Sequence, residues 1–120
     1  MGKYKFVAKI HSDNEKNFTK GICIWNDNKI IYKENNISVT FIYSNNRIEM
    51  NRKSNEYEIC LKFEKNTKTN SIYKFIGGNK EFILKTFTKK IIIGKNKFEI
   101  DYILEDNMFS YKLELEDLWY

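Results

Sequence analysis

Apolar and polar residues alternate along most of the chain. Between residues 3 and 11 the apolar set is Tyr4, Phe6, Ala8 and Ile10, and the polar set between them is Lys3, Lys5, Lys9 and His11. The same alternation recurs in residues 37–43, 57–63, 98–104 and 109–115. Successive side chains of a β-strand point to opposite faces, so a period of two predicts strands that are buried on one face.

Short clusters of Asn, Asp and Gly separate these segments. They lie at residues 26–29, 35–36, 44–46, 77–79, 94–96 and 105–107. These residue types tolerate the left-handed backbone of tight hairpins, so we expect consecutive strands to be antiparallel neighbours. The absence of Pro and the abundance of Ile, Tyr, Phe and Thr also favour strands. The pattern predicts about nine to ten strands and no helix.

A series of hairpin-linked strands can bury its apolar faces in a sandwich or in a closed barrel. The segments at the two ends of the chain both alternate strongly, so they can pair with each other and remove the exposed sheet edges. The pattern therefore predicts an all-β fold, a single antiparallel meander closed into a barrel. With 120 residues and no break in composition, residues 1–120 are expected to form one domain.

Composition narrows the setting in which the protein works. No apolar run has the length of a signal peptide or a membrane span. Cys23 and Cys60 lack the spacing of metal ligands and are interpreted as free thiols in a reducing compartment. We expect a cytoplasmic protein with no membrane partner. The formal net charge of +5 comes almost entirely from Lys in a chain rich in Asn and Ile, a composition that AT-rich codon usage also produces.

Several short motifs occur in an order that resembles the YwiB-like family of small bacterial proteins. They are Gly21 before an early hairpin, Tyr32 and Glu34 in a Tyr-x-Glu pattern, Arg52 at a strand end, Phe63, Tyr73, Thr86 and Tyr102. Two features depart from the family pattern: the link after Glu34 is short, and Ser54 stands where Gly often follows the Arg. The resemblance covers most of the chain. It implies a calycin-like, lipocalin-like barrel and no known activity.

Arg52 is the most unusual residue of the alternating pattern. It shares the phase of Ile48 and Met50, so its side chain is expected to point inward. An inward guanidinium is costly unless it is paired. Glu34 is also expected to point inward, since it shares the phase of Tyr32. A structural pair of Arg52 and Glu34 would then plug one end of the barrel.

The pair has two readings, which the sequence leaves open. In the structural one, the hydroxyl of Tyr73 or Tyr102 joins the pair. In the functional one, Arg52 binds the acidic head group of a small apolar or amphipathic ligand, and aromatic side chains hold its tail. The candidate ligand-binding residues are Arg52, Glu34, Tyr32, Tyr73, Thr86 and Tyr102. The interior of so small a barrel can also be filled by its own side chains.

Catalytic and metal-binding patterns are missing from the sequence. His11 is the only His and lies on the Lys-rich outward face, without a Ser, Cys or acidic partner that the sequence places. One His and two distant Cys do not make a metal site. We therefore expect a protein that is not an enzyme and uses no cofactor.

Two other functions stay open. The apolar residues Val7, Ile42, Ile83 and Ile103 are out of phase and would form a patch for a homodimer or another protein partner if they cluster. Residues 85–97 are basic and offer Phe87 as an outward ring, as single-stranded nucleic-acid binders do. Acidic residues are interleaved with Lys elsewhere, which makes nucleic acid the least favoured partner.

Overall fold

The computed structural model describes residues 2–118, which fold into strands joined by short loops. The strands are β1 (Gly2–Ser12), β2 (Lys16–Asn26), β3 (Lys29–Glu34), β4 (Ile37–Ser44), β5 (Arg47–Lys53), β6 (Tyr57–Glu64), β7 (Thr67–Phe75), β8 (Glu81–Ile93), β9 (Lys97–Leu104) and β10 (Asn107–Asp117). They follow one another around a closed barrel, and β10 pairs with β1 to complete the ring. The expected antiparallel meander is confirmed.

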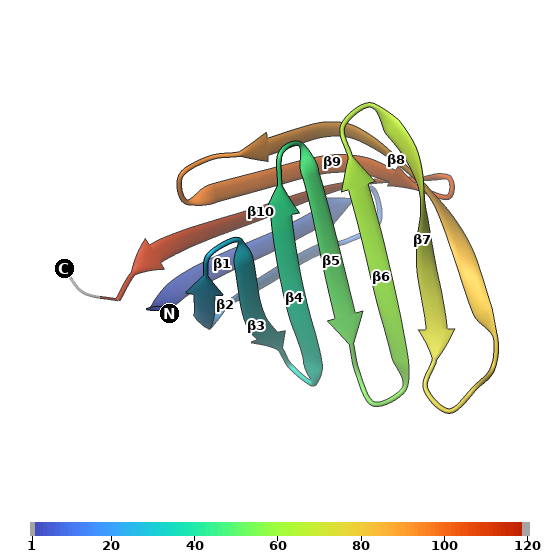
Figure 1. The fold of residues 1–120 in the computed structure, drawn as a ribbon, viewed down its shortest axis with the longest axis horizontal. Coiled ribbons are helices and arrows are strands. Elements are labelled where there is room, and N and C mark those ends of the chain that lie inside the picture. Colours follow the sequence, from blue (N-terminus) through green and yellow to red (C-terminus); the bar gives the residue numbers. More distant parts are fainter. Residues whose placement is uncertain (1, 119–120) are drawn as a thin grey trace.

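The barrel is flattened into two layers. Strands β3 to β7 lie side by side in one layer, and β8, β9, β10 and β1 cross behind them (Figure 1). β8 bends sharply as it passes from one layer to the other. The register of β8 against β9 shifts between Thr88 and Lys90, and such a bulge increases the local bend and twist of a strand.

Two-residue turns fix the register of five hairpins. Each turn contains a residue with positive φ, between 55° and 58°: Asp27, Asn35, Asn46, Asn66 and Glu105. Four of these turns lie in the clusters predicted from the sequence, and the turn at Asn66 does not. Asn and Asp adopt this backbone at low cost because their short polar side chains bond locally. The hairpins therefore set which side chains of neighbouring strands share a face.

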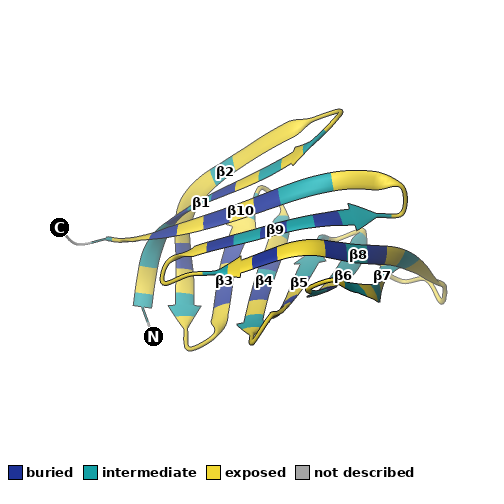
Figure 2. Ribbon diagram, turned by 90° about the horizontal axis from the view of Figure 1, so that it is seen from above, coloured by how far each residue is buried: buried dark blue, intermediate teal, exposed yellow. Residues whose placement is uncertain are grey.

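The middle of the barrel is filled by its own side chains. Phe6, Phe41, Phe63, Phe98 and Tyr111 are all at least 98% buried. The ring centroids of Phe41 and Phe98 are 5.3 Å apart, and those of Phe41 and Tyr111 are 6.1 Å apart. Figure 2 shows the resulting alternation of buried and exposed residues along each strand. A ligand enclosed in this central region, as the functional reading of the sequence supposed, would have to displace core side chains.

A short buried polar strip interrupts the apolar core on β7 and β8. The hydroxyls of Ser71 and Thr86 share a hydrogen bond of 2.8 Å, and Ser71 also accepts one from the backbone N–H of Lys62. Thr86 Oγ1 donates to the carbonyl of Leu84 at 3.1 Å. Thr88 Oγ1 is different, because it is buried and has no hydrogen-bond partner among the residues described.

Replacing Thr88 by Val is expected to stabilise the protein. Val keeps the branched shape and removes a buried hydroxyl that has lost water without gaining a partner, so the free energy of unfolding should rise by about 1 kcal/mol. Urea denaturation measures this change. Thr86→Val is the matched control, since it breaks two hydrogen bonds and should lower the free energy of unfolding by about 1–2 kcal/mol. Equal losses in both variants would contradict the assignment.

Candidate functional site

An ion pair lies at one end of the barrel. Nη2 of Arg52 on β5 donates a hydrogen bond to Oε1 of Glu34, the last residue of β3. The two side chains are 19% and 22% exposed, so the pair is largely removed from water without being sealed from it. The inward orientation of Arg52 and its contact with Glu34, both expected from strand phase, are confirmed.

The guanidinium of Arg52 is charged, and only some of its N–H donors are hydrogen-bonded within the described part of the protein. Burial acts to lower its pKa, but the charge and the hydrogen bond of Glu34 raise the pKa by more, and the net shift is upward. A guanidinium carries five N–H donors. One is bonded to Glu34, and among residues 2–118 the structure describes no protein acceptor for the others. The Arg52 side chain is 19% exposed, and its Nε and Nη1 are not among the buried atoms without a partner, so both keep some contact with water.

Two tyrosines support the pair from inside the barrel. The hydroxyls of Tyr32 and Tyr111 share a hydrogen bond of 2.7 Å, and the ring of Tyr32 stacks on Phe6 with centroids 4.3 Å apart. Burial raises the pKa of Tyr32 to about 12 and that of Tyr111 well above its ordinary value. Both phenols therefore stay neutral beside the pair, and the charge of Arg52 acts to lower both pKa values.

The expected hydroxyl partner of the pair was wrong. Neither Tyr73 nor Tyr102 bonds to Arg52 or Glu34 within the part of the chain described. Tyr102 is buried in the core, where its ring stacks on Phe109. Burial raises the pKa of Tyr102, and the positive charge of Arg52 acts in the opposite direction. Sequence reasoning missed Tyr111 because its hydroxyl meets Tyr32 across 79 residues of chain.

The inner face places Arg52 in a row of residues that crosses six strands. The cross-strand partners, in order from β3 to β8, are Tyr32, Val39, Arg52, Ile59, Tyr73 and Phe82. Neighbouring strands are about 4.8 Å apart, so the backbone of Phe82 lies about 14 Å from that of Arg52 along this face. The row thus joins a charged group to an apolar surface within the length of a small amphipathic molecule.

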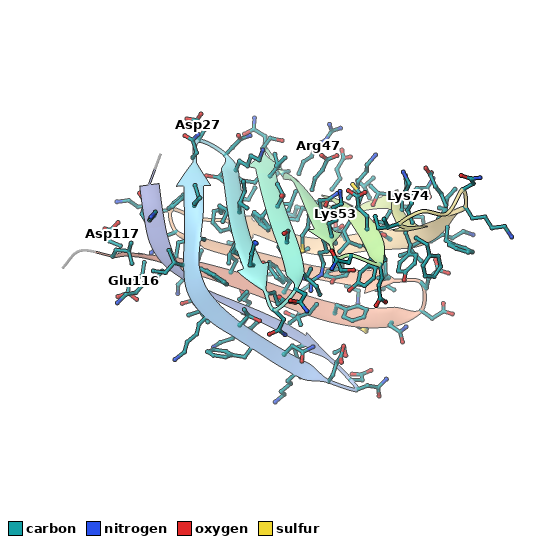
Figure 3. The ribbon with its side chains drawn as sticks, turned by 90° about the horizontal axis from the view of Figure 1, so that it is seen from below. Asp27, Arg47, Lys53, Lys74, Glu116 and Asp117 are labelled. Carbon is teal, nitrogen blue, oxygen red and sulfur yellow. The ribbon has the colours of Figure 1, made fainter. Side chains whose placement is uncertain are left out.

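An aromatic cluster occupies the β8 end of this row. It consists of Tyr57, Tyr73, Phe75 and Phe82, with neighbouring ring centroids 5.1 to 6.4 Å apart. These residues have the inward phase of their strands, yet Phe75 and Phe82 are 49% and 47% exposed. Aromatic side chains are seen at this end of the molecule beside the labelled Lys53 and Lys74 (Figure 3). The inner face is therefore open to solvent beyond the packed core.

The sequence-predicted site residues separate into two groups. Tyr32, Arg52 and Tyr73 share the cross-strand row, and Glu34 joins it through the ion pair. Thr86 lies deeper, bonded to Ser71, and Tyr102 belongs to the core, so neither lies on the open face. Sequence reasoning missed Tyr57, Phe75 and Phe82. Their phase, which equals that of Tyr73, was the available signal.

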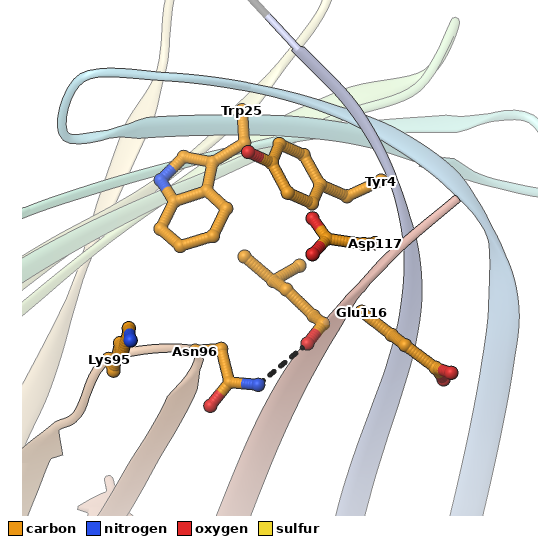
Figure 4. Close-up of a pocket in the computed structure, with 7 residues that line it drawn as sticks. Tyr4, Trp25, Lys95, Asn96, Glu116 and Asp117 are labelled. Carbon is orange, nitrogen blue, oxygen red and sulfur yellow. Dashed lines mark hydrogen bonds between the residues drawn. The ribbon is translucent and has the colours of Figure 1, made fainter. Parts of the chain in front are cut away.

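A cavity of about 620 Å³ lies at the opposite end of the barrel (Figure 4). Tyr4 and Trp25 form one wall with ring centroids 5.0 Å apart, and Leu115 contributes the other apolar surface. Its polar lining is Lys95, Asn96, Glu116 and Asp117. The amide of Asn96 already donates to the carbonyl of Leu115, and Glu116 and Asp117 place negative charge at the rim. This cavity is a poorer match for an acidic head group than the Arg52 end.

The outer surface carries the remaining sequence candidates. The residues Val7, Ile42, Ile83 and Ile103 lie on β1, β4, β8 and β9 and do not gather into one patch. Although β8 and β9 are neighbours, Ile103 lies opposite Phe87, four residues from Ile83. Phe87 is half-buried and lines a cavity of about 420 Å³ with Lys68 and Lys85. Both thiols are free, and no helix of residues 2–118 is long and apolar enough to cross a membrane.

A Ser, His and Asp also meet on the outer face. His11 lies opposite Ser110 on β10, and Ser110 lies opposite Asp101 on β9. Ser110 Oγ donates to Oδ1 of Asp101 at 2.8 Å. In a hydrolytic triad the acid orients the His and the His bonds to the Ser. Here the acid is bonded to the Ser instead, so this arrangement does not have the order of a triad.

The chain resembles known proteins in both sequence and fold. Residues 5–115 match the family model of a domain of unknown function, DUF1934. The chain belongs to this family. The DUF1934 fold seen here is similar to the crystal structure of the ywiB protein from Bacillus subtilis, with a TM-score of 0.65 and 18% identity over 96% of this chain and 89% of that one. The YwiB-like family expected from the motifs is confirmed, and at this identity the likeness concerns the fold alone. No curated protein matches this DUF1934 chain.

Removing one partner of the ion pair is expected to destabilise the protein. Either Arg52→Ala or Glu34→Ala leaves a partly buried charge without its partner, so each should lower the free energy of unfolding by about 1–3 kcal/mol. Denaturant titration of both single variants and the double variant measures the coupling. Arg47→Ala is the control, because the Arg47–Glu64 pair is exposed and should cost less than about 1 kcal/mol. Additive losses at Arg52 and Glu34 would show that the contact contributes nothing.

Alkaline pH is expected to weaken the fold through the buried tyrosines. The folded-state pKa of Tyr32 is about 12, above the ordinary value of about 10, so the stability that its neutral form contributes is complete below pH 10 and is lost between pH 10 and 12. Denaturation at pH 9 and at pH 11 measures the loss. Tyr32→Phe should make the slope shallower by about 1 kcal/mol per pH unit in that window. An unchanged slope would mean that Tyr32 is not protected from ionisation.

Proposed function

We propose that the protein binds a small amphipathic molecule with an acidic head group at the Arg52 end of the barrel. One observation carries this proposal. Solvent-facing N–H groups of Arg52 and the exposed rings of Phe75 and Phe82 belong to one open inner face. Ligand sites combine an apolar surface with few polar anchors, and this face has that composition.

The head group would bind to the free side of the guanidinium. Arg presents parallel N–H groups that match a carboxylate or a phosphate with two hydrogen bonds. Glu34 holds the guanidinium in place and cancels its charge, so a bound anion needs further positive charge nearby. Lys33 and Lys53 are the nearest candidates: they follow the outward phase next to Glu34 and Arg52 and line a cavity of about 390 Å³ at the β3–β4 and β5–β6 turns, so they add positive charge at this end from the outer side.

The tail would lie on the aromatic cluster. An extended chain of about 14 Å reaches from Arg52 to Phe82 along the cross-strand row. Burying the exposed parts of these rings under a tail gains about 25 cal/mol for each Å² of apolar surface removed from water. This arrangement modifies the calycin-like, lipocalin-like hypothesis: the ligand lies across the open end of the barrel and not inside its packed middle.

Decanoate and decanol together test the proposal, since they share a tail and differ in charge. We expect isothermal titration to show that Arg52→Gln weakens decanoate binding by about tenfold and leaves decanol binding unchanged. Phe82→Ala should weaken the binding of both. Arg47→Gln is the matched control for charge and should change neither.

Two results would contradict this site. Decanoate and decanol binding that are equally insensitive to Arg52→Gln would remove Arg52 as the anchor. Binding that is lost in Trp25→Ala and kept in Phe82→Ala would place the ligand in the 620 Å³ cavity at the other end. A native mass spectrum of gently purified protein, followed by organic extraction, would then identify any molecule carried from the cell.

A further inference from the structure

β2 keeps a free edge over most of its length. It pairs with β1 from Lys16 to Trp25, but with β3 only from Ile24 to Asn26. On the side away from β1, residues 16–23 have no strand partner within residues 2–118. Figures 2 and 3 agree that β2 leaves β3 and continues as one arm of the β1–β2 hairpin.

The register shows which main-chain groups line this edge. In an antiparallel ladder the N–H and C=O of one residue point to one neighbouring strand, and those of the next residue point to the other. Tyr43 donates to the carbonyl of Asn28, so even-numbered residues of this segment face β4 and odd-numbered ones face β2. The β2 partners of the odd-numbered residues are even-numbered. Lys16, Phe18, Lys20 and Ile22 therefore direct their N–H and C=O groups to the free edge.

The side chains of the same four residues lie on the outer face, and Lys16 is exposed like Lys20. Phe18 and Ile22 are 58% and 56% exposed, and the exposed Lys20 lies between them. Natural edge strands avoid pairing with other chains through charge, bulges or short length. This edge is long, and two of its four outward side chains, those of Phe18 and Ile22, are large and apolar. It offers four donors and four acceptors, and from Lys16 to Ile22 its side chains are alternately basic and apolar.

The length of β3 and the packing of Phe6 on the inner side of β2 both bear on this free edge. The ring of Phe6 lies beneath Gly21, where a Cβ atom would come within 3.3 Å of it, and the same ring stacks on Tyr32 of β3. β3 also ends at Glu34, which in the β2–β3 register would lie opposite Gly21, so residues 16–20 extend beyond the end of β3. The free edge is therefore part of the packed fold.

We propose that this edge docks an extended acidic segment of a partner protein, which adds to the barrel as a further strand. Strand addition uses main-chain hydrogen bonds for affinity and alternate side chains for specificity. Opposite Lys20 the segment carries Asp or Glu, and two residues away on each side it carries apolar side chains that pack against Phe18 and Ile22. Lys9, the β1 neighbour of Phe18, adds positive charge on the same face.

A second copy of this chain is a poorer occupant. In the antiparallel register that uses all four edge residues of both copies, Lys20 lies diagonally across from Lys20 and Lys16 of the other copy, so four lysines would share one face without an acidic partner. A single-stranded nucleic acid would use the lysines and the Phe18 ring, but it has no strand-spaced series of donors and acceptors for the free main-chain groups. The unpaired ladder is the observation that favours a peptide.

Synthetic peptides of about eight residues test the proposal. The first has Val at positions 3 and 7, Asp at position 5 and Thr elsewhere, and the second has Lys in place of the Asp. We expect the Asp peptide to bind the full chain at least about tenfold more tightly by fluorescence anisotropy. Amide hydrogen exchange should slow at Phe18, Lys20 and Ile22 and stay unchanged at Thr19, whose N–H already bonds to β1.

Charge reversal at the edge provides the decisive variant. Lys20→Glu should invert the preference between the two peptides, whereas Lys68→Glu, an exposed change on β7, should leave it unchanged. Equal binding of both peptides, no binding of either, or no protection of the three amides would overturn the proposal. So would concentration-dependent dimerisation that Lys20→Glu abolishes, or oligonucleotide binding that competes with the Asp peptide, because each would assign the edge to another occupant.

Discussion

The pairing of β1 with β10 is the constraint on which the rest of the structure depends. Nine residue pairs, from Tyr4 with Asp117 to Ser12 with Phe109, join the first and last strands and turn a meander into a barrel. The β1–β10 pairing also fixes which side chains of these two strands point inward, because a slip of one residue would turn the inward side chains of one of the two strands, Phe6 on β1 or Leu113 on β10, from the core to the solvent. The two-residue hairpins then fix the inward side chains of the strands between them.

The strands of this barrel are longer than its core, and both candidate surfaces follow from that difference. Large apolar side chains fill the middle, where Phe41, Phe98 and Tyr111 meet. Beyond the middle, inward residues meet water, as at Phe82, or need a charged partner, as at Arg52. β2 also extends beyond the segment that pairs with β3, and the backbone groups on that side of the extension are unpaired within the described part of the chain. Open inner faces and open edges are therefore two results of one geometric mismatch.

Alternation and turn chemistry sufficed to predict the strands, their antiparallel order and the closure. The Arg52–Glu34 pair could be predicted as well, because two inward charges in an apolar phase have few other partners. The exposure of Phe75 and Phe82 could not be predicted from the sequence. Tyr73 has the same inward phase, and only the relative lengths of the strands decide which of these rings the core covers. The Tyr32–Tyr111 bond and the early end of the β2–β3 pairing also depend on three-dimensional twist, which phase alone does not contain.

The closure of the barrel also sets how the chain must fold. The contacts between β1 and β10 join residues that are separated by almost the whole sequence, whereas most other strand pairs are hairpins that can form locally. The entropic cost of closing so long a loop precedes the favourable contacts between β1 and β10. The ring is therefore expected to close late and slowly. During synthesis, β1 emerges from the ribosome first, and the edge that pairs with β10 stays unpaired until β10 has emerged. The lysines that alternate along β1 then act as its protection against premature association in the growing chain.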